Sequence, residues 1–269
     1  MRFLRILLFV CLPLTGSAAG YAKFKHGRTT LRVPQSAVQS GAEELRWRLH
    51  SMSLPGAFDI RKEKFDLIVP RDYTHDKSYG LFIWISPGST PALPASWLPV
   101  LAQKKLIFVG AANSGNRRNI FDRMRMAIDV NHHIRSTFNI DPNRVHLSGF
   151  SGGGRVASML GVCYADMFPR TIPFMGVNYY KQVPGEKDRV FNPSYIPDEQ
   201  VLLIAQRNCR YVLVTGEKDF NRINTKSIFE HGFKQDGFRF VRYVEVPKLA
   251  HKLPSAEQFA KILGLIESR

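Results

Sequence analysis

The chain has 269 residues, of which 38 are basic and 22 acidic, so its formal net charge at pH 7 is +16. An excess of this size predicts attraction to polyanions. The basic residues are spread along the chain and are not interleaved with stacking aromatic residues, which argues against a nucleic-acid-binding module. Solvated surface charge is the simpler interpretation. An acidic substrate, such as an acidic polysaccharide, or an anionic envelope surface is the sharper alternative.

The first residues have the pattern of a secretory signal peptide, which we place at residues 1–19. Arg2 and Arg5 precede an apolar stretch at 6–14, and the small residues at 17–19 form a cleavage site. The apolar stretch is shorter than the roughly 20 residues of a membrane-spanning helix. We therefore expect a secreted or periplasmic protein with no transmembrane segment after cleavage. Loss of the two arginines would leave a net charge of +14.

The rest of the chain alternates short apolar runs with longer segments of helical spacing. Residues 20–60 are predicted to be a basic N-terminal arm with one short helix near 43–50. Residues 61–269 are predicted to form a single domain without a separate lid domain. The alternation predicts an α/β domain, in which helices cover both faces of a mostly parallel sheet. The predicted strands are 65–69, 81–86, 106–110, 145–148, 172–177, 211–215 and 240–246, and the predicted helices 119–138, 153–164, 225–236 and 255–267.

The segment Gly149-Phe150-Ser151-Gly152-Gly153 lies between a predicted strand and a predicted helix. A serine at so sharp a corner needs neighbours without bulk, which the glycines supply. The helix that begins there would direct backbone N–H groups at whatever Ser151 attacks. The alternative, a phosphate-binding loop, lacks both the Lys-Ser/Thr pair and the GxGxxG pattern. In this context the pattern predicts the nucleophile of a serine hydrolase with an α/β-hydrolase fold.

A serine nucleophile needs a histidine to take its proton and a carboxylate to orient that histidine. In this fold the three follow in the order Ser, Asp/Glu, His. His251 is the only histidine beyond the strand 240–246, so we take it as the base. Asp219, past the end of the strand 211–215, is the preferred acid, and Glu217 is the alternative. The other histidines considered lie inside predicted elements and are expected to be structural or on the surface: His132, His133, His146 and His231.

The tetrahedral intermediate requires N–H donors for its oxyanion. Gly152, directly after the nucleophile, is the first candidate. Gly88 or Ser89, in the loop after the strand 81–86, is the second, because Pro87 has no N–H. The alternative interpretation of this loop is a plain Pro-Gly turn.

Substrate-binding residues are sought on loops that leave the carboxyl ends of strands. Tyr179 and Tyr180 follow the strand 172–177 and are candidates to line a pocket, and packed surface tyrosines are the alternative. Arg117 follows the strand 106–110 and is a candidate for contact with an anionic substrate, with a solvated loop as the alternative.

Two cysteines, Cys163 and Cys209, remain after removal of the signal peptide. In an oxidising compartment they are able to form one disulfide, and two buried free thiols are an equally good interpretation. Neither has a second ligand at metal-binding spacing, so no metal site is expected.

The segment 139–154, Asn-Ile-Asp-Pro-Asn-Arg-Val-His-Leu-Ser-Gly-Phe-Ser-Gly-Gly-Gly, resembles the nucleophile region of the secreted esterases grouped with polyhydroxyalkanoate depolymerases and feruloyl or acetyl xylan esterases. The order of the other elements looks alike from about residue 65 onward. The resemblance implies a triad at Ser151, Asp219 and His251, carboxylic ester substrates that include polysaccharide-linked or polymeric esters, and no cofactor. Two departures concern the loop before the oxyanion site, where Ser86-Pro87-Gly88 replaces a frequent His-Gly, and Ala250, which replaces a frequent glycine.

Two other functions use the same features. A serine peptidase of the same fold would use identical groups on a less reactive carbonyl, although no gating domain is predicted. A non-catalytic, basic, polyanion-binding protein on a hydrolase scaffold is the alternative from another class. The presence of all three triad candidates in the expected order argues against it.

Overall fold

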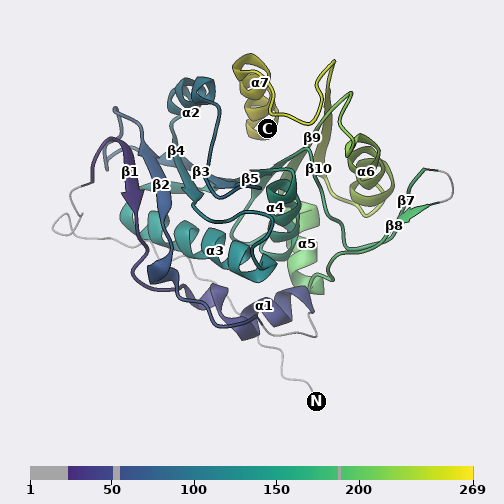
Figure 1. Cartoon of the computed structure of the whole chain (residues 1–269), viewed down its shortest axis with the longest axis horizontal. Coiled ribbons are helices and arrows are strands. Elements are labelled where there is room, and N and C mark those ends of the chain that lie inside the picture. Colours follow the sequence, from purple (N-terminus) through teal and green to yellow (C-terminus); the bar gives the residue numbers. More distant parts are fainter. Residues whose placement is uncertain (1–23, 51–54, 187–188, 269) are drawn as a thin grey trace.

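The computed structural model describes residues 24–50, 55–186 and 189–268, so the predicted signal peptide lies outside the described residues. Figure 1 shows a central sheet with helices on both sides. In chain order the elements are β1 (Gly27–Leu31), α1 (Ala42–Leu49), β2 (Phe65–Val69), β3 (Tyr79–Ile85), α2 (Leu98–Gln103), β4 (Leu106–Ala111), α3 (Ile120–Thr137), β5 (Ile140–Phe150), α4 (Gly152–Cys163), β6 (Arg170–Phe174), β7 (Val183–Pro184), β8 (Val190–Phe191), α5 (Glu199–Asn208), β9 (Arg210–Gly216), α6 (Arg222–Ser227), β10 (Phe240–Val246) and α7 (Ala256–Glu267).

Eight of the strands form one sheet in the order β1-β2-β4-β3-β5-β6-β9-β10. β2 pairs antiparallel with both β1 and β4, and the other neighbours pair parallel. β7 and β8 form a separate antiparallel ribbon. The predicted α/β architecture with a mostly parallel sheet is confirmed.

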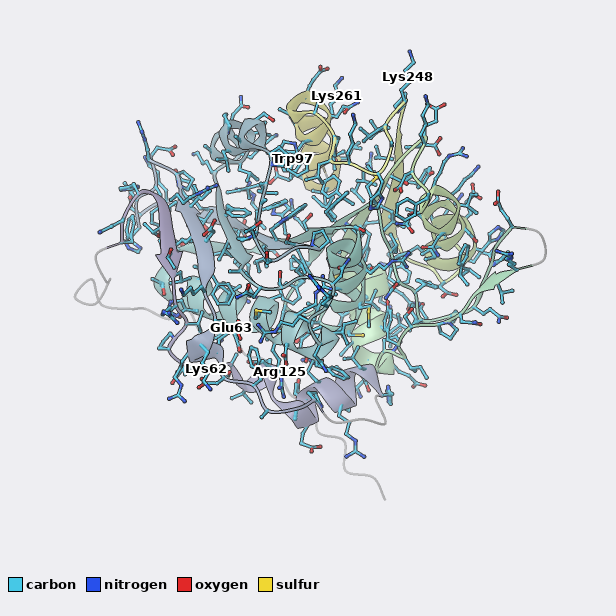
Figure 2. The ribbon with its side chains drawn as sticks, viewed as in Figure 1. Lys62, Glu63, Trp97, Arg125, Lys248 and Lys261 are labelled. Carbon is cyan, nitrogen blue, oxygen red and sulfur yellow. The ribbon has the colours of Figure 1, made fainter. Side chains whose placement is uncertain are left out.

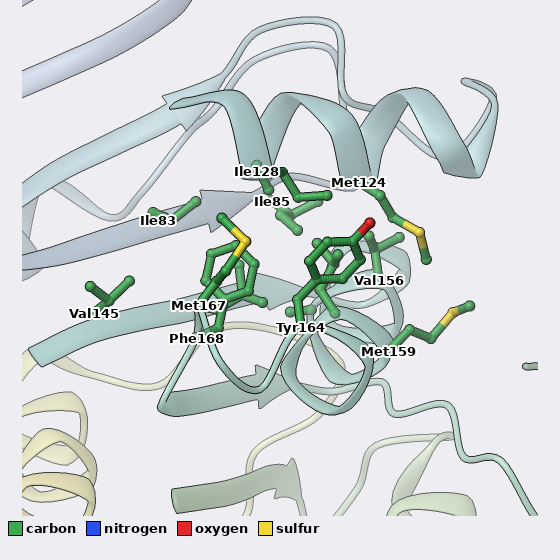
Figure 3. Close-up of a cluster of buried hydrophobic side chains, with 14 of the residues drawn as sticks. Ile83, Ile85, Met124, Ile128, Val145, Val156, Met159, Tyr164, Met167 and Phe168 are labelled. Atoms are coloured by element: carbon green, nitrogen blue, oxygen red, sulfur yellow. The ribbon is translucent and has the colours of Figure 1, made fainter. Parts of the chain in front are cut away.

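Successive side chains of a strand point to opposite faces of the sheet, so the apolar strands build a hydrophobic core on each face. On one face, Ile83 and Ile85 of β3 pack with Met124 and Ile128 of α3, as Figure 3 shows. On the other face, Phe82 and Trp84 lie in a core with α2 and α7, where the ring of Trp97 stacks on that of Phe259 at 3.7 Å. Full burial of one such side chain is worth about 1.5–3 kcal/mol.

Side-chain caps fix where three of the helices begin. Asn119 accepts a hydrogen bond from the Phe121 N–H at the start of α3, and Asp198 accepts two at the start of α5. α7 begins with a capping box between Ser255 and Gln258. Each cap contributes roughly 1 kcal/mol by satisfying N–H groups that have no partner within the helix.

The N-terminal segment contains more structure than the sequence predicts. The expected helix is present as α1, but residues 27–31 also form an edge strand, β1. No side chain of β1 is fully buried, so this strand has no apolar alternation that would reveal it in the sequence. Arg48 anchors α1 to the body of the molecule through Asp166, at 2.6 Å.

Other differences from the sequence prediction are local. α2, α5 and the β7–β8 ribbon were not predicted. The predicted helix 225–236 is divided into α6 and a π-helical segment, Ile228–Phe233. Cys163 and Cys209 are buried free thiols, and burial raises the pKa of Cys209 to about 12.

Many basic side chains project into solvent, among them Lys248 and Lys261, which point away from the body in Figure 2. In the described part of the chain, no helix is long and apolar enough to cross a membrane. Residues 24–50, 55–186 and 189–268 also contain no cluster of three or more His, Cys, Asp or Glu side chains suited to a metal ion.

Candidate active site

Ser151 occupies the corner between β5 and α4, in a strained backbone conformation. Its φ of 53° lies in the left-handed region, which non-glycine residues rarely adopt. The corner is closely packed, because a Cβ on Gly153 would lie 1.9 Å from the carbonyl oxygen of Ile85 at the end of β3. The glycines therefore allow α4 to start directly against the sheet, which holds the serine at the carboxyl edge of β5.

The three triad candidates meet at this edge of the sheet. Nε2 of His251 lies 3.0 Å from Oγ of Ser151, and Nδ1 lies 2.8 Å from Oδ1 of Asp219. With the proton on Nδ1, that N–H donates to Asp219, and Nε2 accepts from the serine hydroxyl. His251 comes from the β10–α7 loop and Asp219 from the β9–α6 loop. Three loops far apart in sequence thus form one continuous chain of hydrogen bonds.

The Asp219 carboxylate is held from several sides. Its side chain is fully buried, its Oδ1 accepts from the Asn221 N–H at 3.0 Å, and its Oδ2 accepts from the Thr215 hydroxyl at 3.1 Å. The Asn221 side chain in turn donates to the Met175 carbonyl. Glu217, the alternative acid, instead accepts from the Lys248 N–H at 2.6 Å and ties the two loops together.

Two phenyl rings contact the imidazole of His251. The Phe220 ring lies 4.2 Å away and the Phe150 ring 4.9 Å away, measured between ring centroids. Phe220 is 75% exposed, although it is a large apolar residue. We call this arrangement of Phe150, His251 and Phe220 the aromatic clamp. The other histidines lie elsewhere, and His146 is completely buried inside β5.

The predicted oxyanion loop and the loop after β4 enclose a cavity of about 290 Å³. Gly88, Ser89 and Arg117 all line it. The Gly88 N–H donates to the hydroxyl of Ser86 at 3.1 Å. The carboxamide of Asn116 lies against Gly152, since a Cβ on that glycine would be 2.0 Å from the Asn116 Oδ1. Asn116 also lines this cavity, so the cavity lies close to the backbone directly after Ser151.

The comparison with known proteins rests on structure alone. The sequence matches no family model and no curated protein. Est1E from Butyrivibrio proteoclasticus is 14% identical, with a TM-score of 0.54 over 79% of this chain and 98% of that chain. The feruloyl esterase module from Clostridium thermocellum complexed with sinapinate is 13% identical, with a TM-score of 0.52 over 76% and 81%. The acylaminoacyl peptidase of Pyrococcus horikoshii is 15% identical, with a TM-score of 0.51 over 74% and 37%.

The chain has the α/β-hydrolase fold. At such low identity the likeness establishes this architecture and no particular esterase subgroup.

In this fold, Arg123 of α3 lies beneath the loop that leaves β3, where its Nη2 donates to the Ser86 carbonyl at 3.2 Å. Arg123 is only 5% exposed, and burial lowers its pKa to about 10. Among the described residues it has no carboxylate partner, so it supports the predicted oxyanion loop as an isolated buried cation.

The two tyrosines predicted to bind substrate are packed in this α/β-hydrolase fold. Tyr179 and Tyr180 are buried, and their hydroxyls donate to Oδ2 of Asp236 at 2.6 and 2.8 Å. Both tyrosines are thus packed within the protein, in line with the alternative to a pocket-lining role. Tyr179 does line a cavity of about 170 Å³, which it shares with Arg155 of α4.

Four residues near the triad were not predicted from the sequence: Asn116, Arg123, Arg155 and Phe220. The position of Asn116 in the sequence could have indicated it, since it directly precedes Arg117 on a loop that follows a strand end. The same holds for Phe220, because it directly follows Asp219. The two arginines lie within helices, where an arginine is ordinarily a solvated surface residue.

Proposed function

We propose that this protein is a serine esterase that hydrolyses carboxylic ester bonds. The observation that carries the proposal is the unbroken hydrogen-bonded chain from Asp219 through His251 to Ser151. The esterase-like fold supports it. The sequence resemblance to secreted polymer and polysaccharide esterases supports the finer proposal that the enzyme is exported and acts on polysaccharide-linked or polymeric esters.

The reaction would proceed by two acyl transfers. Nε2 of His251 takes the proton of Ser151 as its Oγ attacks the ester carbonyl, and Asp219 stabilises the resulting imidazolium. His251 then protonates the departing alcohol. In the second step it removes a proton from water, which attacks the acyl-enzyme and releases the acid.

The developing oxyanion would lie at the start of α4. The Gly152 N–H and the positive end of α4, which begins at this glycine, would stabilise its negative charge. The cavity beside it is lined by Gly88, Ser89 and Asn116, which are candidates for the second donor. Because the Gly88 N–H already donates to Ser86, we favour Ser89 or the Asn116 carboxamide for this contact.

Labelling with a fluorophosphonate probe, together with turnover of short-chain aryl acetates, tests the proposal. The mature chain should label and turn over, and Ser151→Ala should do neither. Ser136→Ala is the matched control, because Ser136 lies on the exposed end of α3 and bonds only its own helix. If the parent chain neither labels nor turns over, the hydrolase proposal is wrong.

The likeness to a peptidase keeps amide hydrolysis as a second candidate. The triad is equally suited to both bonds, and the leaving group decides between them. Acyl anilides should be hydrolysed at least about 100-fold more slowly than the matching aryl esters if the protein is an esterase, a difference of about 2.7 kcal/mol in the activation barrier. Comparable rates would favour the peptidase.

A further inference from the structure

A second cavity, of about 380 Å³, lies beside the acid loop of the triad. Phe220 and Asn221 form its wall on the triad side, and these residues contact His251 and Asp219 respectively. Val190 and Phe191 of the β8 strand also line it, together with Arg155. The neighbouring cavity of about 170 Å³ shares Arg155, Val190 and Phe191 with it, so the two cavities are adjacent.

Arg155 is the feature of this groove that calls for a ligand. It lies one helical turn after the nucleophile, where its N–H donates to the Ser151 carbonyl at 3.0 Å. Its guanidinium donates to three neutral oxygens, those of Val177 and of the Asn178 and Asn221 side chains. Within the part of the chain that the structure describes, no carboxylate lies at ion-pair distance from it.

The charge of Arg155 is therefore only weakly compensated. Burial lowers its pKa, while the more distant charge of Asp219 opposes this shift. The guanidinium nevertheless stays protonated near neutral pH. A partly buried cation with neutral partners is costly unless an anion completes its coordination. The described lining of the cavity contains a second arginine, Arg189, and one acidic residue, Glu186. Its net charge is therefore positive.

We propose that Arg155 forms a carboxylate-binding subsite, and that the preferred substrates are esters that carry a second, unesterified carboxylate. The walls of Phe220, Val190 and Phe191 would hold the apolar segment between the two groups. Two Arg155 N–H groups make no hydrogen bond to the described residues, namely the one on Nε and one of the two on Nη2. A bound carboxylate would accept hydrogen bonds from these two groups. This subsite rests on the proposed esterase function and names the substrate class for the same triad.

Matched ester pairs test the charge of the substrate separately from its size. The first series consists of monoethyl esters of linear dicarboxylic acids of increasing chain length, each compared with its neutral ω-amide. The second consists of acetate esters of ω-hydroxy acids, compared with their amides, which moves the carboxylate to the alcohol side. We expect kcat/KM to favour the carboxylate about tenfold or more at one chain length in one series, as for a charge-assisted hydrogen bond.

Arg155 also supports Asn221 and thereby Asp219, so its loss will slow every substrate. The ratio of kcat/KM between carboxylate and amide separates the two roles, because a supporting role affects both equally. Arg155→Gln should reduce the ratio to near one, and Arg155→Lys should retain part of it. Arg28→Gln removes the same charge from the remote strand β1 and should leave the ratio unchanged.

The outcomes are distinguishable. Equal rates for every pair in the parent chain would overturn the subsite and leave the esterase function intact. A carboxylate preference that survives in Arg155→Gln would show that another residue binds the carboxylate, and would also overturn it. Absence of turnover together with absence of fluorophosphonate labelling would instead refute the proposed function.

Discussion

The aromatic clamp on His251 makes a prediction that separates positioning from folding. In Phe220→Ala the imidazole loses one of its two ring contacts, at 4.2 Å, and keeps that of Phe150. An aromatic pair is worth about 0.5–1.5 kcal/mol beyond its buried area. If this contact energy holds the imidazole between Asp219 and Ser151, losing the contact lowers the fraction of molecules in which His251 is placed to take the serine proton. The rate at which Ser151 reacts should then fall by about 2- to 13-fold.

Stability should change little in the same variant. Phe220 is 75% exposed, so little apolar area is lost, and a substitution at such a site typically shifts the free energy of unfolding by about 0.5 kcal/mol or less. The assay is the rate constant for labelling by a small aliphatic fluorophosphonate, which does not need the aromatic wall, together with the urea midpoint. Phe240→Ala, at the opposite end of the strands and 41% exposed, is the control. An unchanged labelling rate in a fully folded Phe220→Ala protein would refute the positioning role.

Asp219→Asn should lower kcat by about 10³- to 10⁴-fold because the imidazole loses its tautomer control, whereas Glu217→Gln should retain most activity in the same assay. Arg123→Met removes an isolated buried cation, so the urea midpoint should stay the same or rise. The kcat should fall, because the Ser86 carbonyl loses its hydrogen-bond partner. A lower midpoint with unchanged kcat would contradict this. Burial lowers the pKa of His146 to about 3, below the ordinary 6.5. Between these two pH values the unfolded chain binds a proton that the folded chain does not. The free energy of unfolding should therefore fall by about 1.4 kcal/mol for each unit that the pH is lowered from 6.5 to 3. His146→Gln should remove this part of the pH dependence in urea titrations.

The sequence predicts the frame of the site because that frame depends on local patterns. The apolar runs locate the central strands, and the glycines around Ser151 identify the corner where β5 passes into α4. The chain order of serine, acid and histidine then selects Asp219 and His251 from the candidates. Each of these signals lies within a few residues of the group it identifies.

The parts that sequence does not predict depend on contacts between distant segments. β1 is an edge strand without a buried face, so pairing with β2 and not hydrophobic pattern specifies it. Asn116 reaches Gly152 only because the loop after β4 folds across the start of α4. Whether Arg123 and Arg155 face solvent or protein depends on the packing of α3 and α4, which a helical period alone does not determine.

The left-handed backbone at Ser151 determines how this protein would respond to selection for heat resistance. Strain of this kind costs of order 1–3 kcal/mol, and glycine adopts the same φ without it. Ser151→Gly should therefore unfold at a higher temperature than Ser151→Ala, although both lack the nucleophile. A directed-evolution screen that rewards thermal stability alone would favour inactive clones at this position. Selection for stabilised variants of this protein needs an activity readout from the first round.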